Sequence, residues 1–172
     1  SMRREFHQNP EASMEEYNTS KRIKEELEKM GVEYRGIAGT GVIATIKGAH
    51  PGKCIALRGD IDALAVVEET GKDYASKNPG LMHACGHDTH AAMLLGAVKV
   101  LNEMKDEIYG TVKFFFQPGE EVGNGARKMV EEGALEGVDS AMGIHIASML
   151  PVGTINAEAG PRMAAADKFK IT

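Results

Sequence analysis

The chain has 172 residues, of which 42% are hydrophobic and 26% charged, as expected for a globular domain with a sizeable core. A formal net charge of −5 argues against nucleic acid or an anionic membrane as the main partner, and no apolar run approaches the roughly 20 residues that span a bilayer. Two cysteines are too few for a disulfide scaffold and the polar N-terminal residues show no signal peptide, so we expect a cytoplasmic protein.

The first half of the chain predicts one helix followed by two strands. Residues 11–31 predict the helix, because Ile23, Leu27 and Met30 recur at helical spacing and a glycine follows that can end it. Alternating β-branched residues then predict strands at the positions that follow. These strands are residues 40–48 and 54–64, with a turn at residues 49–53 between them.

The second half predicts two more helices among several strands. A long helix is expected from Asp88 or Thr89, either of which can cap it, to about Met104. The other expected elements are strands at residues 110–118, 138–147, 152–160 and 163–172 and a short helix at residues 124–135. Alternating strands and helices indicate an α/β fold, with a central twisted sheet, largely parallel or mixed, and helices on both faces. No turn follows the last expected strand, so we expect further protein beyond it.

Three histidines, a cysteine and an aspartate are gathered in residues 83–90, directly before the long predicted helix. Cys85 and His87 are two residues apart, so in an extended segment both side chains would project to the same side. Thiolate and imidazole are the commonest ligands of zinc-like ions, and sites in α/β proteins gather outside the carboxyl ends of strands. The alternative is a helix start that merely carries polar residues, with a small buried cysteine and surface histidines.

Two further candidate groups also lie at strand ends. Glu120 and Glu121 follow an apolar strand, and adjacent carboxylates repel each other unless a cation or a reaction uses them. One could bind a metal while the other takes a proton from water, although most such pairs are solvated surface turns. His145 lies in another apolar strand, where a lone histidine is usually a core or edge residue. Together with Cys85 and His87, these groups predict a metallohydrolase site more strongly than any one of them alone.

The sequence closely resembles a known family in five motifs, whose order and spacing are specific. The motifs are LRGDIDALAV (57–66), MHACGHDTHAAMLLGA (82–97), FFQPGEE (115–121), GIHI (143–146) and PVGT (151–154). They resemble the metal-dependent amidohydrolases of the aminoacylase and carboxypeptidase class. The nearest branch contains N-acyl-amino-acid amidohydrolases, hippurate hydrolases and plant auxin-conjugate hydrolases.

The resemblance implies a role for several residues. Glu120 would be the general base, and Asp62 an acidic residue near the metal site that orients an imidazole. The metal ligands that it implies are Cys85, which would bridge two ions, His87, Glu121 and His145. It assigns no role to Asp60 or His90, and we expect His7 only to begin a segment.

The resemblance also implies an activity and a domain organisation. Family members cleave the amide bond of N-acyl amino acids or related conjugates, with metal-activated water and two divalent ions. Zinc or manganese is expected, and cobalt or nickel would also fit the ligands. Residues 1–166 would be the first half of a catalytic domain. Residues 167–172 would begin the crossing into a lid and dimerisation domain, through which the parent enzyme forms a homodimer. We therefore expect the chain alone to be inactive.

Two other function classes stay open. One is a cysteine hydrolase with Cys85 as nucleophile, but no oxyanion motif is evident and Glu120 and Glu121 would then be idle. The other is an inert fragment that binds a structural metal or a partner. Structural zinc sites usually have four closed cysteine and histidine ligands, so the mixed set here favours catalysis.

Overall fold

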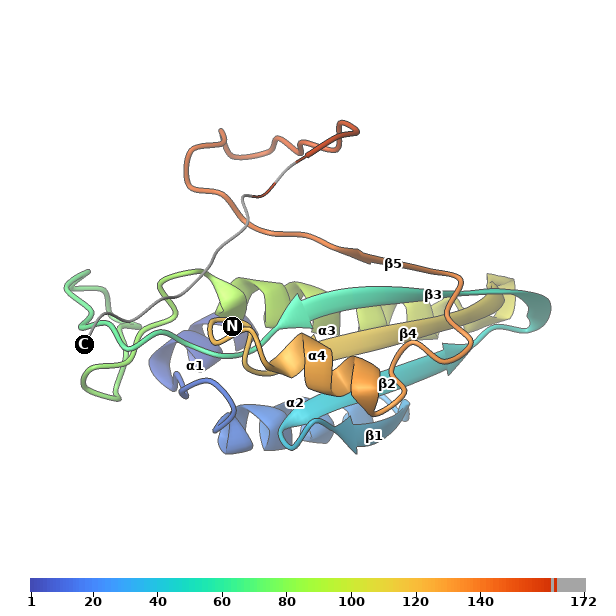
Figure 1. The fold of residues 1–172 in the computed structure, drawn as a ribbon, viewed down its shortest axis with the longest axis horizontal. Helices are drawn as coiled ribbons and strands as arrows, with labels where there is room; N and C mark the ends of the chain where they lie inside the picture. The colour runs from blue at the N-terminus through green and yellow to red at the C-terminus, as the bar shows by residue number, and fades with distance from the viewer. Residues whose placement is uncertain (162, 164–172) are drawn as a thin grey trace, which may run out of the picture.

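The computed structural model describes residues 1–161 and 163, which form one mixed sheet with helices packed on it (Figure 1). The helices are α1 (Met2–Gln8), α2 (Tyr17–Lys29), α3 (His87–Glu103), the 3-10 helix η1 (Lys105–Glu107) and α4 (Gly125–Glu131). The strands are β1 (Glu33–Ile37), β2 (Gly41–Lys47), β3 (His50–Asp60), β4 (Tyr109–Gln117) and β5 (Ser140–Gly143). None of the helices in this part of the chain is both long and apolar enough to cross a membrane.

The sheet has the strand order β1-β2-β4-β3-β5. Strands β1, β2 and β4 pair antiparallel, whereas β3 runs parallel to both β4 and β5. Asp60 lies opposite Gln117, so β3 and β4 end at the same edge of the sheet. The predicted α/β class with a mixed sheet is therefore confirmed. This pairing also places the loop with Asp62 beside the loop with Glu120 and Glu121.

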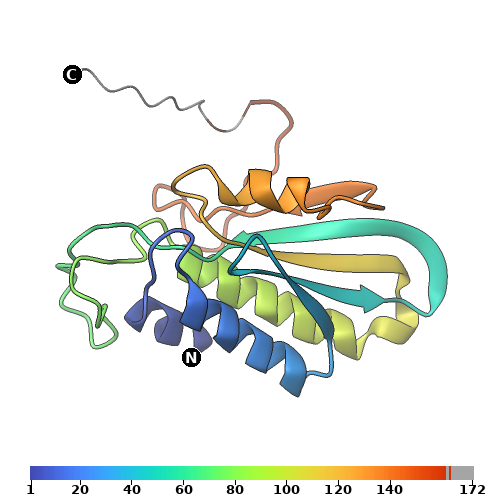
Figure 2. The ribbon, with the colours of Figure 1, turned by 60° about the horizontal axis from the view of Figure 1, so that its bottom comes forward.

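Helices cover both faces of the sheet, as predicted. Figure 2 shows α1, α2 and α3 on one face and α4 on the other. The side chains of β4 alternate between the two layers, as the period of two along a strand requires. Phe114 and Phe116 join Leu27 in the core beneath α2 and α3, whereas Phe115 packs with Met129 of α4. Two apolar cores thus hold the central strands from opposite sides.

Several boundaries in the first part of the chain differ from the predictions. The sequence pattern missed α1, which has only seven residues, and β1, whose side chains mostly face solvent and so show no apolar alternation. Strand β3 already begins at His50, where a turn was expected, and its pairing with β4 is irregular between His50 and Cys54. Helix α3 begins at His87, because Gly86 with φ of 88° takes the cap position expected for Asp88 or Thr89.

The predicted strands at the C-terminal end were largely wrong. Of residues 138–147 only Ser140–Gly143 pair with β3, and His145 lies beyond the strand. Residues 152–160 form turns and irregular backbone, and most of the strand expected at 163–172 lies outside the described residues. An alternating sequence forms a strand only where a neighbour supplies hydrogen-bond partners. Within the described chain, β5 is the last strand of the sheet on that side.

The packing of α2 predicts a large loss of stability for Leu27→Ala. Leu27 is fully buried. Its truncation should lower the free energy of unfolding by about 2–5 kcal/mol, because the surrounding core cannot fully close the cavity. Urea denaturation measures this difference. Lys21→Ala on the same helix is the control, since the Lys21 side chain is 76% exposed, and it should change stability by less than about 0.5 kcal/mol. Equal effects of the two substitutions would contradict the described packing of α2.

Candidate metal centre

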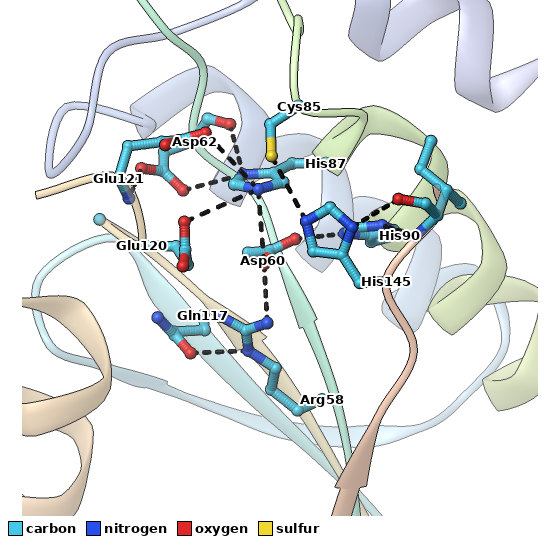
Figure 3. Close-up of polar contacts among 12 residues, drawn as sticks. Arg58, Asp60, Asp62, Cys85, His87, His90, Gln117, Glu120, Glu121 and His145 are labelled. Atoms are coloured by element: carbon cyan, nitrogen blue, oxygen red, sulfur yellow. Dashed lines mark hydrogen bonds and ion pairs between the residues drawn. The ribbon is translucent and has the colours of Figure 1, made fainter. Parts of the chain in front are cut away.

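A cluster of candidate ligands lies at the carboxyl edge of β3 and β4 (Figure 3). The loop after β3 supplies Asp62, and the loop after β4 supplies Glu120 and Glu121. The remaining three side chains are Cys85 just before α3, His87 at the first position of α3, and His145 beyond the end of β5. The six residues singled out from the sequence are thus brought together. The reasoning for two of them was wrong, since His87 is helical and His145 is not in a strand.

Among the residues singled out from the sequence, the ligand atoms form two groups that share one imidazole. Cys85, His87 and His145 can each offer one ligand atom within 4.8 Å of the others. His87, Glu120 and Glu121 can do the same. Two neighbouring groups of this kind suit two ions close together rather than one isolated ion.

Asp62 fixes the orientation of the His87 ring. Nδ1 of His87 lies 3.0 Å from the backbone oxygen of Asp62 and 3.2 Å from its Oδ1, both of which can only accept a hydrogen bond. Nδ1 therefore carries a proton, which leaves Nε2 as the ring nitrogen available to an ion. Nε2 lies 3.7 Å from a carboxylate oxygen of Glu121 and 3.9 Å from one of Glu120. A carboxylate that holds a histidine in this way is the usual companion of a metal-binding imidazole.

The Asp62 carboxylate stays ionised although it is buried. Burial alone would raise its pKa, but hydrogen bonds outweigh this effect and lower the pKa to about 2. The donors are His87, the Ser13 hydroxyl at 2.6 Å and the backbone N–H of Glu121 at 3.0 Å. One carboxylate therefore connects the N-terminal segment, helix α3 and the loop after β4.

The residues present fit divalent metal ions. Nε2 of His87 and Oε1 of Glu121 are buried and have no hydrogen-bond partner in the described chain. Leaving such atoms unpaired costs about 1–3 kcal/mol each. Thiol, imidazole and carboxylate groups together are the donor set of zinc and related transition metals. A bound cation would satisfy both atoms.

The acidic groups of the site oppose one another's ionisation. Burial, and then the Glu121 charge, raise the pKa of the Cys85 thiol to about 11. The pKa of Glu121 is also raised, first by burial and then by Glu120 and Asp62, although His87 acts against this. Burial would lower the pKa of His87, but the neighbouring carboxylates raise it overall. The site thus carries excess negative charge that a cation would neutralise.

Asp60 and His90 also belong to this cluster, and sequence reasoning gave them no role. Both are buried, and Nδ1 of His90 lies 2.6 Å from Oδ1 of Asp60. The other oxygen of Asp60 lies 2.7 Å from Nη1 of Arg58, which also donates to Gln117. The available signal was spacing, since His90 is one helical turn after His87.

Two buried groups outside the cluster hold the segments that carry it, and sequence analysis missed both. His7 lies 2.9 Å from a carboxylate oxygen of Asp88 and 3.2 Å from one of Glu68, so α1 is attached to the first turn of α3. Glu16 is fully buried and accepts the backbone N–H of Gly119 at 2.8 Å, directly before the two glutamates.

Comparison with known proteins identifies the family of the chain. The family model for Peptidase family M20/M25/M40 matches residues 56–170. N-acetyl-L-cysteine deacetylase of Bacillus subtilis is 49% identical over 99% of the chain, which spans 41% of that protein. Thermostable carboxypeptidase 1 of Saccharolobus solfataricus is 50% identical over 99% of the chain, which spans 44% of it.

A solved structure shows the same fold. The YXEP protein of Bacillus subtilis, a dinuclear metal-binding peptidase from the M20 family, superposes with a TM-score of 0.91 and 48% identity. The superposition covers 93% of this chain and 46% of that one. The chain therefore spans less than half the length of the proteins that it matches. These similarities confirm the class predicted from the motifs, and the chain belongs to peptidase family M20/M25/M40.

Proposed function

We propose that this chain supplies the metal centre of a hydrolase that cleaves the amide bond of N-acyl amino acids or related conjugates. The observation that carries the proposal is the meeting of two groups of ligand atoms at His87, whose Nε2 is buried and has no hydrogen-bond partner among the described residues. The similarity to an N-acetyl-L-cysteine deacetylase and to a carboxypeptidase supports an amide substrate. Zinc or manganese suits the donors best.

In this proposal, metal binding and proton transfer are carried out by different residues. Cys85, His87, Glu121 and His145 would hold the ions. When bound, two divalent ions would lower the pKa of a water molecule and polarise the scissile carbonyl. Glu120 would take the proton of the attacking water and deliver it to the nitrogen of the leaving amine.

Exposure distinguishes the two glutamates. The side chain of Glu120 is 41% exposed, whereas that of Glu121 is 18% exposed. A general base must reach water and substrate, while a ligand must face the ions, so Glu120 suits the first role and Glu121 the second. The loop is fixed at both ends, because Glu16 accepts the N–H of Gly119 and Asp62 accepts that of Glu121. The two carboxylates are therefore presented by a defined backbone rather than by a free loop.

The electrostatics argue against Cys85 as a nucleophile. Reactive cysteines have a lowered pKa, because the thiolate attacks. The pKa of Cys85 is instead raised to about 11, by burial and then by Glu121. A cation beside the sulfur would reverse this effect and give the thiolate needed for metal binding.

Glutamine substitutions should separate the roles of the two glutamates. Turnover is measured on N-acetyl-L-cysteine with this chain fused to the remaining C-terminal residues of the Bacillus subtilis deacetylase. Glu120→Gln should keep the metal content of the unsubstituted fusion and lower turnover by about 10² to 10⁴-fold, because it removes the proton acceptor. Glu121→Gln should lower metal content, measured by elemental mass spectrometry.

The unsubstituted fusion is the reference for both activity and metal content. The 172-residue chain is a second reference for both measurements. Equal metal loss in both variants, or full activity of Glu120→Gln, would contradict the assignment of roles. A fusion that binds both ions and hydrolyses no N-acyl amino acid would count against the proposed function itself.

Alkylation kinetics should show whether the Cys85 thiol behaves as a nucleophile. In a Cys54→Ser background without metal, its reaction with iodoacetamide should accelerate about tenfold per pH unit from about pH 7 to 9.5. The thiolate fraction grows in this way while the pH stays below the pKa. An ordinary thiol with a pKa of about 8.5 would level off within that range. Mass spectrometry of the modified chain gives the rates, and a plateau near neutral pH would favour the cysteine hydrolase.

A further inference from the structure

The segment that carries His145 has no secondary structure of its own. Strand β5 ends at Gly143, and Ile144, His145 and Ile146 are all exposed. Nε2 of His145 nevertheless lies 3.4 Å from Sγ of Cys85. An exposed irregular segment adopts many conformations unless specific contacts hold it, so the position of His145 needs a cause.

Two contacts hold the residue next to His145. The backbone N–H of Ile146 donates to Nε2 of His90 at 3.0 Å. The Ile146 side chain packs on Gly86 so closely that a Cβ there would lie 2.2 Å from its Cδ1. The backbone oxygen of Ile146 also accepts from Nδ1 of His145 at 2.6 Å, which leaves Nε2 of that ring directed at Cys85. The position of Ile146 therefore determines that of His145.

The hydrogen bonds define which ring nitrogen of His90 donates and which accepts. A backbone N–H can only donate, so Nε2 of His90 must be the acceptor, and the proton must lie on Nδ1. Nδ1 then donates to Oδ1 of Asp60 at 2.6 Å, while Arg58 pairs with the other oxygen of Asp60 at 2.7 Å. Asp60, His87 and His90 also form a group that could hold a metal. In this arrangement Ile146 already uses the lone pair that His90 would give to an ion.

We infer that Asp60 and His90 are positioning residues of the metal centre, which hold Ile146 and thereby keep His145 beside Cys85. The inference rests on the proposed function in so far as His145 is a metal ligand. Asp60 orients the ring, the ring binds the backbone, and the backbone places the ligand. The carboxylate and the imidazole thus act on the ligand His145 through the backbone of Ile146, and they do not contact an ion themselves.

The test compares His90→Phe, which keeps a ring but removes the acceptor, with His90→Gln, whose amide oxygen can accept the Ile146 N–H. The first measurement is hydrogen exchange of the Ile146 amide in the metal-free 172-residue chain. His90→Phe should accelerate this exchange by about tenfold or more, because local opening no longer has to break the bond. The second is zinc affinity by competition titration, which should fall about 10–100-fold, as for other residues that orient ligands. His90→Gln should restore part of the protection of the Ile146 amide and part of the zinc affinity.

Two further variants separate positioning from general destabilisation. Leu27→Ala weakens the core beneath α2 without touching this segment, so it should leave the exchange of Ile146 and the zinc affinity nearly unchanged in the folded chain. Ile146→Pro removes the N–H donor from the exposed side, and its zinc affinity should fall as in His90→Phe. If His90→Phe does not fold, Ile146→Pro provides the zinc-affinity part of the test, since proline has no amide proton to exchange.

Three outcomes would overturn the inference. One is an Ile146 amide that exchanges freely in the unsubstituted chain. Another is a faster exchange of the Ile146 amide in His90→Phe combined with an unchanged zinc affinity in both His90→Phe and Ile146→Pro. The third is an equal loss of affinity in Leu27→Ala. Failure of the unsubstituted chain to bind zinc would instead contradict the proposed function and remove the ligand role of His145, while the exchange data would still decide whether His90 holds the segment.

Discussion

The parallel pairing of β3 with β4 is the constraint on which the candidate site depends. From Cys54 opposite Thr111 to Asp60 opposite Gln117 the register is continuous, so the two strands end level with each other. Everything that follows either strand therefore starts from the same edge of the sheet. A slip by one residue would turn the buried side chains of β4 to the wrong layers and separate the two loops as well. The apolar alternation of the core thus sets the geometry of a polar site that it does not touch.

The polar site in turn is stable only because its charges are partly compensated. Asp60 is paired with Arg58 and His90, and Asp62 accepts three kinds of donor, so these two carboxylates are satisfied by the protein. Oε1 of Glu121, by contrast, is buried without a hydrogen-bond partner in the described chain, and burial raises the pKa of both Glu121 and Cys85. The protein thus compensates the carboxylates that orient ligands, whereas two ligand atoms, Nε2 of His87 and Oε1 of Glu121, have no hydrogen-bond partner in the described chain. In such a site the free energy of metal binding also contributes to the stability of the fold.

Sequence reasoning recovered the parts of the molecule whose signal is local. Helical spacing in α2 and α3 and the alternation of β2 and β4 reflect burial on a face, which each segment shows by itself. The meeting of Asp62 and Glu121 also followed, because the ends of parallel strands in an α/β sheet lie together, whereas Cys85 reaches the site from the segment before α3 and not from a strand end. The strand expected at residues 152–160 was wrong, since pairing depends on a neighbour that a single segment does not reveal. The partners of Glu16 and His7 were missed for the same reason, as each lies far away in the chain.

The two groups of ligand atoms consequently differ in what holds them in place. His87 is held by its helix and by Asp62, and Glu121 is held by a loop that is anchored at both ends. The positions of these two ligands therefore follow from the register of the sheet. His145 stands on an exposed segment and depends on the contacts of Ile146 with Gly86 and His90. One side of the centre is thus built by the fold as a whole, and the other by one buried histidine that binds a backbone N–H. That difference gives a reason for the burial of Asp60 and His90, which we infer to be positioning residues.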